Sequence, residues 1–396
     1  MAKGYGARLI CRPHAAGRTL CTMRFRSAAL TALSVTLCAG PAVSQSRSAA
    51  DLPFKLSAPP GFGIDVVSTA VAGARFLAVA PNGDVIVSEI GRGAVVAVRP
   101  GSPPNSAPRM VARGLERPNG LAFRGNDLYI ATWSGITVIP DYPRGIGSPR
   151  VLFSDMPRNA DHNARAVALA DDGSIYISSG SDCNICRESN PRLATVLRYN
   201  ADGTGGRIFA SGLRNASGLA VGPFGRLWAV VNQRDNLRPD HTNLPPDELD
   251  LLRDGGDYGW PGCYPVDAER RPNPEFPSAD CSGALPTTFN FPAHSAPLQA
   301  LFYRGTQFPA HYRGALFVAY HGSWNRQPPT GYKVVAVTFT DGLPTSVEDF
   351  VTGWLTAGYQ VRGRPVGLAT AADGSLYISD DTGYVFRVSY GRGAGG

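Results

Sequence analysis

Alternating apolar and polar positions recur along the chain in a pattern that predicts β-hairpins. Each copy has an apolar alternation, a turn centred on glycine, and a second alternation that ends in small or polar residues. Examples are FLAVAPNGDVIVSE at residues 76–89 and GLATAADGSLYISD at residues 367–380. Alternation with a period of two on both sides of Asn-Gly or Asp-Gly is a strong local indication of a hairpin. The turn glycines of six copies are Gly83, Gly125, Gly173, Gly225, Gly314 and Gly374.

Successive turn glycines are 42 to 89 residues apart, and this spacing predicts an all-β, six-bladed β-propeller. A repeat of this length holds about four strands, and one such sheet cannot bury both of its faces until it stacks against neighbours around an axis. The longest interval predicts a loop insertion, about residues 235–296, between the fourth and fifth blades. A long non-repeating segment of this kind is typical of a functional loop, although a surface excursion without chemistry is the alternative. We expect residues 45–396 to form a single propeller.

Composition and charge narrow the choice of function. The 396 residues include 46 glycines and 33 prolines, which argues against a helical bundle or coiled coil. Six of the seven net positive charges fall in residues 1–44, which contain no acidic residue, so the rest of the chain is nearly neutral. A protein that binds the phosphate backbone of nucleic acid would carry a basic surface. We therefore expect no nucleic-acid partner.

Residues 1–44 are predicted to be a leader. From Met23, which we take as the possible true start, the chain runs through a basic Arg-Phe-Arg, an uncharged apolar stretch at 27–40, and small residues at 42–44. This order is typical of a signal peptide, and the apolar stretch is too short to span a membrane. We expect a periplasmic or secreted protein without a membrane span.

Removal of the leader leaves four cysteines, and an oxidising compartment favours two disulfides. The simplest pairing is Cys183 with Cys186 and Cys263 with Cys281. A zinc site is less favoured, because the single CxxC has no second CxxC or histidine pair near it. Redox catalysis by the CxxC is less favoured still, because the strand and helix expected around such a motif are missing.

Polar residues precede the first predicted strand of several blades. His162 follows Asp161 at such a position, where an imidazole can face the central channel and serve as a general base; a histidine in a surface turn is the alternative. Arg214 and Asn215 hold the same place in the next blade. If the propeller prediction holds, these groups converge on one end of the channel.

Two further arginines, Arg362 and Arg364, precede the first strand of the last blade. Alternate positions of an extended segment point the same way, and paired guanidinium groups suit a ligand with several carboxylates. Elsewhere, PDEL at 246–249 and GGDYGWP at 255–261 offer carboxylate and backbone oxygens of the kind that Ca²⁺ binds, although ordinary turns explain them as well. HGSWNR at 321–326 suits a planar ligand or a sugar.

Several longer strings give the chain a family resemblance. SGSDCNIC at 179–186, PPDELDLL at 245–252, GGDYGWPGC at 255–263, and HGSWNR followed by GYKVV resemble the glucose/sorbosone dehydrogenase family over about residues 59–388. The resemblance is closest to the branch similar to L-sorbosone dehydrogenase. It implies a soluble six-bladed quinoprotein that uses pyrroloquinoline quinone (PQQ) and Ca²⁺.

The resemblance also implies roles for individual residues. His162, paired with Asp161, would remove the hydroxyl proton of the sugar, and Arg214 with Asn215 would lie beside the quinone carbonyls. The cofactor carboxylates would be held by Arg362 and Arg364, with Arg326 in place of a lysine that the glucose-oxidising members use. The main chain near Arg234 and Asp235 would bind the Ca²⁺ of the cofactor, and Glu248 and Tyr258 would belong to a separate structural Ca²⁺ site.

The sequence thus predicts an exported dehydrogenase that oxidises an aldose or a sugar aldehyde such as sorbosone to its lactone or acid. Its partners would be the small-molecule sugar and a periplasmic electron acceptor. A Ca²⁺-dependent propeller lactonase is one alternative, for which carboxylates and Asn rather than arginines are expected around the channel metal. A cofactor-free binding propeller is the other alternative, favoured if the arginines do not converge.

Overall fold

The computed structural model describes residues 54–145, 148–158 and 161–391, together with three short strands nearer the N-terminus. The chain divides into two compact units, Met1–Val43 and Ser44–Gly396. In the first unit, β1 (Leu9–Arg12) pairs antiparallel with β2 (Leu20–Met23). The predicted apolar stretch and cleavage site of the leader, residues 27–44, lie outside the described residues.

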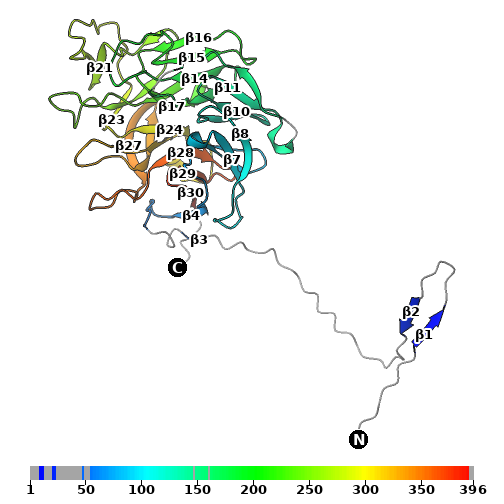
Figure 1. Ribbon diagram of the computed structural model, residues 1–396. Helices are drawn as coiled ribbons and strands as arrows, with labels where there is room; N and C mark the ends of the chain where they lie inside the picture. Colours follow the sequence, from blue (N-terminus) through cyan, green and yellow to red (C-terminus); the bar gives the residue numbers. More distant parts are fainter. Residues whose placement is uncertain are drawn as a thin grey trace. The chain divides into compact units, whose positions relative to one another are not determined.

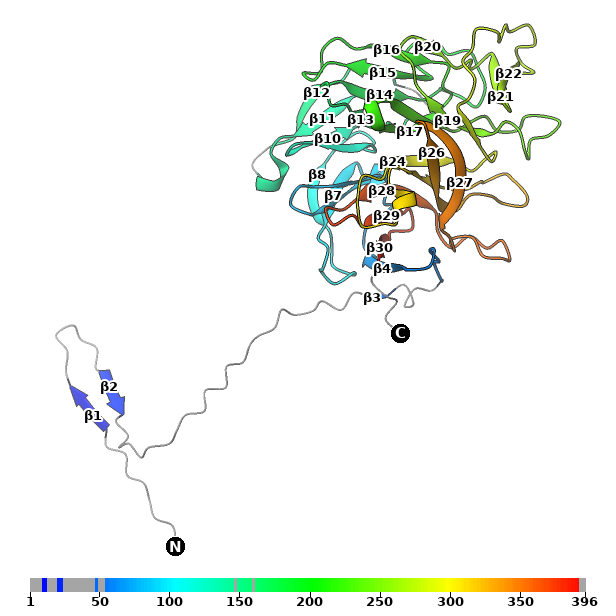
Figure 2. The same ribbon diagram turned by 180° about the vertical axis from the view of Figure 1, so that it is seen from behind.

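The second unit is a six-bladed β-propeller, in which six antiparallel sheets follow one another around a central axis (Figures 1 and 2). Blade one contains β5 (Leu77–Val79), β6 (Val85–Glu89), β7 (Ala94–Val98) and β8 (Arg109–Arg113); blade two contains β9 (Leu121–Arg124), β10 (Asp127–Ala131), β11 (Ile136–Ile139) and β12 (Arg150–Phe153). Blade three contains β13 (Val167–Leu169), β14 (Ile175–Ser179), β15 (Thr195–Tyr199) and β16 (Arg207–Ser211); blade four contains β17 (Ala216–Val221), β18 (Leu227–Val231), β19 (Asp247–Leu251) and β23 (Phe289–Phe291). Blade five contains β24 (Pro297–Phe302), β25 (Leu316–Tyr320), β26 (Lys333–Thr340) and β27 (Leu343–Val351); blade six contains β28 (Pro365–Thr370), β29 (Leu376–Asp380) and β30 (Val385–Tyr390), completed by β4 (Phe62–Ser68) and β3 (Arg47–Ser48).

The glycine turns that predicted the repeat all join the first and second strands of a blade. The φ angles of these six glycines lie between +57° and +90°, a left-handed conformation that glycine adopts without steric cost. The apolar positions on either side face the cores between blades, such as Val85, Leu128 and Ile175, which are fully buried. The predicted propeller is confirmed. Among the described residues there is no α-helix, and no helix is long and apolar enough to cross a membrane.

The last blade is completed by a strand from the start of the second unit. β4 pairs antiparallel with β30, with Ile64 opposite Val388, so a strand near each end of the unit closes the ring. Phe62 at the start of β4 packs edge-on against the rings of Phe308 and Phe350. The sequence pattern did not predict this closing strand, because β4 has no hairpin partner next to it in the chain.

The predicted insertion differs from the structure in its position. β19 and β23, the third and fourth strands of blade four, both fall inside residues 235–296, so the extra segments interrupt this blade and do not follow it. The longer of them spans residues 252–288. It carries β20 (Gly256–Asp257), which adds to the edge of blade three in parallel with β16, and a hairpin of β21 (Cys263–Val266) and β22 (Glu269–Pro272).

The innermost strand of each blade lines the axis. β5, β9, β13, β17, β24 and β28 each contact the next around the ring, and β28 contacts β5 to complete it. Because these strands run in the same direction, the residues that precede them meet at one end of the channel. This placement brings the predicted polar positions of different blades together.

Candidate active site

A cavity of about 350 Å³ opens where the innermost strands begin. Its lining comes from the first five blades and comprises Arg75, Phe76, Arg117, Asn119, Asp161, His162, Asn163, Ala164, Asn215, Ser217 and Leu298. Three predicted site residues, Asp161, His162 and Asn215, are therefore brought together as the repeat implied.

The imidazole of His162 is held from one side by Ser181. Nδ1 of His162 lies 3.1 Å from the main-chain oxygen of Ser181 and 2.9 Å from its hydroxyl oxygen. A carbonyl oxygen can only accept a hydrogen bond, so Nδ1 carries the proton and Nε2 keeps its lone pair. Burial, together with the positive charge of Arg214, lowers the pKa of His162 to about 4. The ring is therefore neutral at physiological pH and able to accept a proton.

Arg214 adjoins this histidine but is not part of the cavity lining. Its side chain is 4% exposed, and it donates hydrogen bonds to the main-chain oxygens of Asn184 (3.1 Å), Asn232 (3.2 Å) and Gln233 (2.9 Å). Its guanidinium carbon also lies 5.7 Å from the centroid of the Trp260 ring. Burial lowers the pKa of Arg214 to about 10, so the group stays charged at neutral pH. Arg214 thus supplies a fixed positive charge behind His162.

The segment predicted to bind Ca²⁺ through its main chain is tied to neighbouring loops. The main-chain oxygen of Asp235 accepts a hydrogen bond from Asn184 Nδ2 at 3.1 Å, and Oδ1 of Asp235 lies 3.1 Å from Nδ1 of His294. The buried Arg234 side chain pairs with Glu275 in the 252–288 segment. The Arg234 guanidinium therefore fixes this segment, and only the main chain here remains a proposed place for a metal.

The three other predicted arginines each have hydrogen-bond partners of their own. Arg326 donates to the main-chain oxygen of Ala293 at 2.8 Å. Arg364 donates to Gly322 O at 2.9 Å, and its guanidinium carbon lies 4.8 Å from the centroid of the Tyr332 ring.

Arg362 is exposed and donates to the side-chain oxygen of Gln360 at 2.6 Å. Residues 362–364 lie outside the regular strands, directly before β28. The expected grip of Arg362 and Arg364 on one ligand stays a prediction.

Glu248 and Tyr258 do not form the calcium site that the resemblance implied. Oε2 of Glu248 lies 2.7 Å from the guanidinium of Arg270, and both side chains are 1% exposed. Glu248 also accepts hydrogen bonds from Gln233 Nε2 and Thr287 Oγ1, each at 2.5 Å. The hydroxyl of Tyr258 donates instead to Leu251 O at 2.6 Å. An arginine already supplies the positive charge here, so these residues do not fit a bound Ca²⁺.

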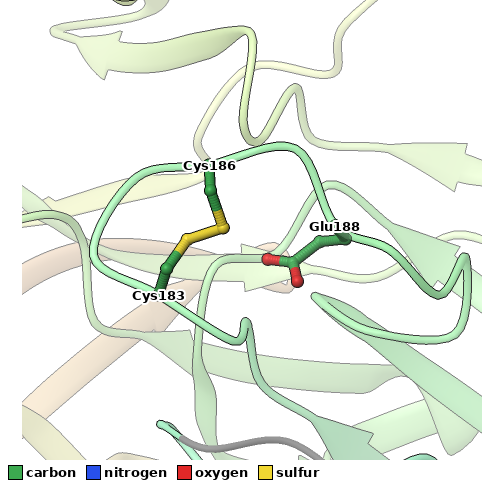
Figure 3. Close-up of side chains that lie close together, drawn as sticks. All are labelled: Cys183, Cys186 and Glu188. Atoms are coloured by element: carbon green, nitrogen blue, oxygen red, sulfur yellow. A yellow bond between two sulfur atoms is a disulfide. The ribbon is translucent and has the colours of Figure 1, made fainter.

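Both predicted disulfides are present. Cys183 pairs with Cys186 and Cys263 with Cys281, with Cα–Cα distances of 6.1 Å and 5.9 Å. Glu188 lies beside the first of them (Figure 3), and this trio is the one cluster of at least three potential metal-binding side chains among the described residues. Because metal ligation by cysteine requires a thiolate, the disulfide removes both sulfurs as ligands.

Two cationic residues of the cavity were missed by the sequence reasoning. Arg75 lines the cavity from blade one, and among the described residues its buried Nε has no hydrogen-bond partner. Arg117 lines it from blade two and donates to Asn163 Oδ1 at 2.6 Å. Both precede an innermost strand, as His162 does, so reading that position in every repeat would have found them.

A second missed feature is a hydrogen-bonded pair of a histidine and a carboxylate. Nε2 of His321, in the predicted HGSWNR motif, lies 2.9 Å from Oδ2 of Asp381. Asp381 also interacts electrostatically with Arg75, whose pKa is lowered mainly by burial. These contacts connect blades five and six to the cationic side of the cavity.

Comparisons with known proteins agree with this architecture. The family model described as TrAA12-like matches residues 56–391. A PQQ-dependent pyranose dehydrogenase from Coprinopsis cinerea is 27% identical over 85% of this chain, and the chain spans about half (54%) of that relative. The structure of the holo form of the PQQ domain of the Coprinopsis pyranose dehydrogenase has a TM-score of 0.73 at 24% identity, covering 85% of this chain and 98% of that domain. A calcium structure of the Trichoderma reesei family AA12 enzyme has a TM-score of 0.71 at 21% identity, covering 85% and 97%.

Proposed function

The chain belongs to the TrAA12-like family, and from that premise we propose that it is a PQQ-dependent dehydrogenase that oxidises an aldose or a sugar aldehyde to its lactone or acid. The observation that carries the proposal is the state of His162. This neutral imidazole lines a cavity at the channel mouth and keeps its lone pair on Nε2. A neutral imidazole in such a place suits a general base.

The cavity suits an anionic cofactor. PQQ is a quinone with several carboxylates, and Arg75 and Arg117 line the same cavity as His162. A ligand carboxylate would satisfy the buried Nε of Arg75, which has no partner among the described residues. When bound, the quinone supplies the acceptor for the hydride that leaves the sugar carbon.

The residues of the chain would handle the proton and the charge. His162 Nε2 would take the hydroxyl proton of the sugar while a hydride leaves the carbon that bears this hydroxyl, so the substrate loses two protons and two electrons in all as its new C=O bond forms. A sugar aldehyde would react as its hydrate, which carries such a hydroxyl. The fixed charge of Arg214 would stabilise negative charge that develops beside it. Asn119 and Asn215 line the cavity and offer amide groups that can orient sugar hydroxyls.

Fewer residues are proposed to bind Ca²⁺ than the sequence implied. Glu248 and Tyr258 do not fit Ca²⁺, for the reasons given above, so we propose only the main chain near Arg234 and Asp235 as its place. The lining combines Arg75 and Arg117 with Asp161 and three asparagines, so it has features expected of a dehydrogenase and of a Ca²⁺-dependent lactonase. The similarity to a PQQ-dependent pyranose dehydrogenase favours the dehydrogenase. Export, a sorbosone-like substrate and a periplasmic electron acceptor remain parts of the proposal.

Dye reduction by the purified protein tests this function. The protein would be incubated with PQQ and Ca²⁺, and reduction of an artificial acceptor would be followed across a panel of aldoses and sorbosone. Turnover that requires PQQ is the expected result. Binding of PQQ without turnover of any sugar would contradict the substrate class, and absence of PQQ binding by absorbance titration would contradict the whole proposal.

A further inference from the structure

The loop that contains the CxxC motif lies next to the proposed active site but contributes no residue to the cavity lining. We call residues 181–188 the disulfide loop. The Cys183–Cys186 bond spans a sequence separation of 3, whereas the Cys263–Cys281 bond spans 18. A cross-link between such close positions removes less entropy from the unfolded chain than one that closes a longer loop. The first disulfide therefore acts chiefly by fixing the shape of its own loop.

One end of the disulfide loop holds the proposed base. The hydroxyl of Ser181 donates to the main-chain oxygen of Cys183 at 2.9 Å, which turns the oxygen of this hydroxyl toward His162 as an acceptor. Nδ1 of His162 lies 2.9 Å from that oxygen and 3.1 Å from Ser181 O. Ser181 thus connects the histidine ring directly to the cysteine of the cross-link.

The middle of the loop holds the fixed charge. Oδ1 of Asn184 accepts hydrogen bonds from Arg214 at 3.0 Å and from the main-chain N–H of Asp235 at 2.9 Å. The main-chain oxygen of Asn184 accepts a further bond from Nε of Arg214 at 3.1 Å. Asn184 lies between the two bonded cysteines, so the disulfide fixes the main chain from which it reaches Arg214.

The far end of the loop folds back on itself beside the disulfide (Figure 3). The carboxylate of Glu188 accepts the main-chain N–H of Asp182 at 3.1 Å and the indole N–H of Trp260 at 3.4 Å. Trp260 in turn lies against the guanidinium of Arg214. The loop is therefore anchored at both ends and in its middle to residues around the proposed base.

We propose that the disulfide loop is the positioning element of this site. Ser181 holds His162 as the Nδ1-protonated tautomer, and Asn184 holds Arg214 behind it. The expected effect of the loop on turnover rests on the proposed function. The expected effect on the tautomer of His162 does not depend on it. Ser181 and Asn184 are positioning residues, because they act through His162 and Arg214 and do not line the cavity.

The first test reads the histidine directly. Long-range ¹H–¹⁵N spectra of the ¹⁵N-histidine-labelled protein, with His162→Gln to identify the signals, should show Nδ1 protonated and Nε2 bare. Ser181→Ala removes the hydroxyl but keeps the main-chain oxygen that accepts from Nδ1, so the tautomer should stay while kcat falls about tenfold, with KM changed by less than about twofold. Ser181→Thr, which keeps the hydroxyl, should restore kcat. An Nε2-protonated ring in the unaltered protein would overturn the tautomer, and an unchanged kcat in Ser181→Ala would overturn the role of the hydroxyl.

The second test compares the two disulfides. Cys183→Ser/Cys186→Ser should lower kcat about tenfold while the melting temperature changes little. The matched control, Cys263→Ser/Cys281→Ser, should lose melting temperature and keep kcat. Full kcat in the first pair, or an equal loss of kcat in both, would mean that the disulfide loop does not position the site.

Failure of the proposed function has a different signature. If the unaltered protein reduces no dye with any sugar, the dehydrogenase proposal fails, yet the histidine spectra still decide whether the loop sets the tautomer. The histidine spectrum of the Cys183→Ser/Cys186→Ser variant is then compared with that of the unaltered protein. Appearance of the Nε2-protonated form in that variant supports the positioning role, and its absence overturns it.

Discussion

The guanidinium of Arg270 lies 2.7 Å from Oε2 of Glu248, and both side chains are almost completely buried. Asp250 is buried close by, and burial together with the negative charge of Glu248 raises its pKa well above the usual value. Arg270 comes from the hairpin strand β22, whereas Glu248 and Asp250 belong to blade four. This pair therefore links the 252–288 segment to the propeller through a buried cation.

Loss of that cation should be strongly destabilising. Arg270→Ala would leave a buried carboxylate without its partner, and we expect a loss of about 3–5 kcal/mol in the free energy of unfolding. Urea unfolding measures the difference. Added Ca²⁺ should not restore the lost stability, because the carboxyl groups here are arranged to pair with a guanidinium group and not to bind a metal ion.

A neighbouring residue provides the control for this variant. Arg271 is 58% exposed and its contact with Glu269 is 3.9 Å long, so Arg271→Ala should change stability by less than about 0.5 kcal/mol. Equal effects of the two substitutions would contradict the importance of the buried pair. Rescue of Arg270→Ala by Ca²⁺ would show that the site still accepts the metal.

His162 should be essential for turnover but not for cofactor binding. His162→Ala removes the proposed base, for which a loss of about 10²–10⁴ in kcat is typical. PQQ affinity, measured by absorbance titration, should stay within about threefold, because the cationic groups of the cavity are unchanged. His311→Ala, at an exposed histidine in contact with Glu348, is the control and should keep full activity. Parallel loss of turnover and of PQQ affinity in His162→Ala would mean that the histidine is structural.

The propeller could be predicted because the sequence signals of its hairpins lie within short segments of the chain. Each turn glycine, such as Gly83 or Gly374, lies between two alternating apolar segments, and adjacent segments pair with each other. The closing strand β4 could not be found in this way, since its partner β30 lies at the opposite end of the unit. Pairing between distant segments leaves no signal in a short window of sequence.

Only some of the predicted site residues lie together in one cavity. Asp161, His162 and Asn215 reach the cavity because they precede innermost strands. Asp247 and Glu248 suggested a loop with calcium ligands, yet they lie in buried strand β19, where main-chain N–H groups and Arg270 satisfy them. Partners that lie far away in sequence decide whether an acidic residue is exposed or buried, and the chain order does not reveal them.

Arg75 should contribute to ligand affinity. Arg75 lines the cavity and its buried Nε has no partner among the described residues, so a carboxylate that reaches this side chain would gain a charge-assisted hydrogen bond. Such a bond is worth about 1.5–3 kcal/mol, and Arg75→Ala should therefore weaken PQQ binding about 10- to 100-fold in an absorbance titration. Arg150→Ala, at an exposed position in β12, is the control for charge alone. Unchanged affinity in Arg75→Ala would place the cofactor carboxylates elsewhere in the channel.

The pH dependence should report the environment of His162. Its pKa in the folded protein is lowered to about 4 from an ordinary value near 6.5, mainly by burial and then by the charge of Arg214. Activity that needs the neutral ring should therefore persist on acidification until the pH approaches about 4. The same shift affects stability: the unfolded chain binds this proton first, so the contribution of His162 to stability is complete above about 6.5 and is lost as the pH falls toward 4.

Removal of the charge of Arg214 separates the two causes of this shift. Arg214→Gln should raise the pKa of His162, because a positive charge that disfavours the imidazolium is gone, while burial continues to hold the pKa below its ordinary value. Titration of the His162 signals in ¹H–¹⁵N spectra measures the shift without requiring turnover. The acid limb of kcat/KM should move to higher pH by the same amount if His162 is the base. A limb that stays fixed while the histidine titration moves would assign the essential proton to another group, for which His321 with Asp381 is the structural candidate.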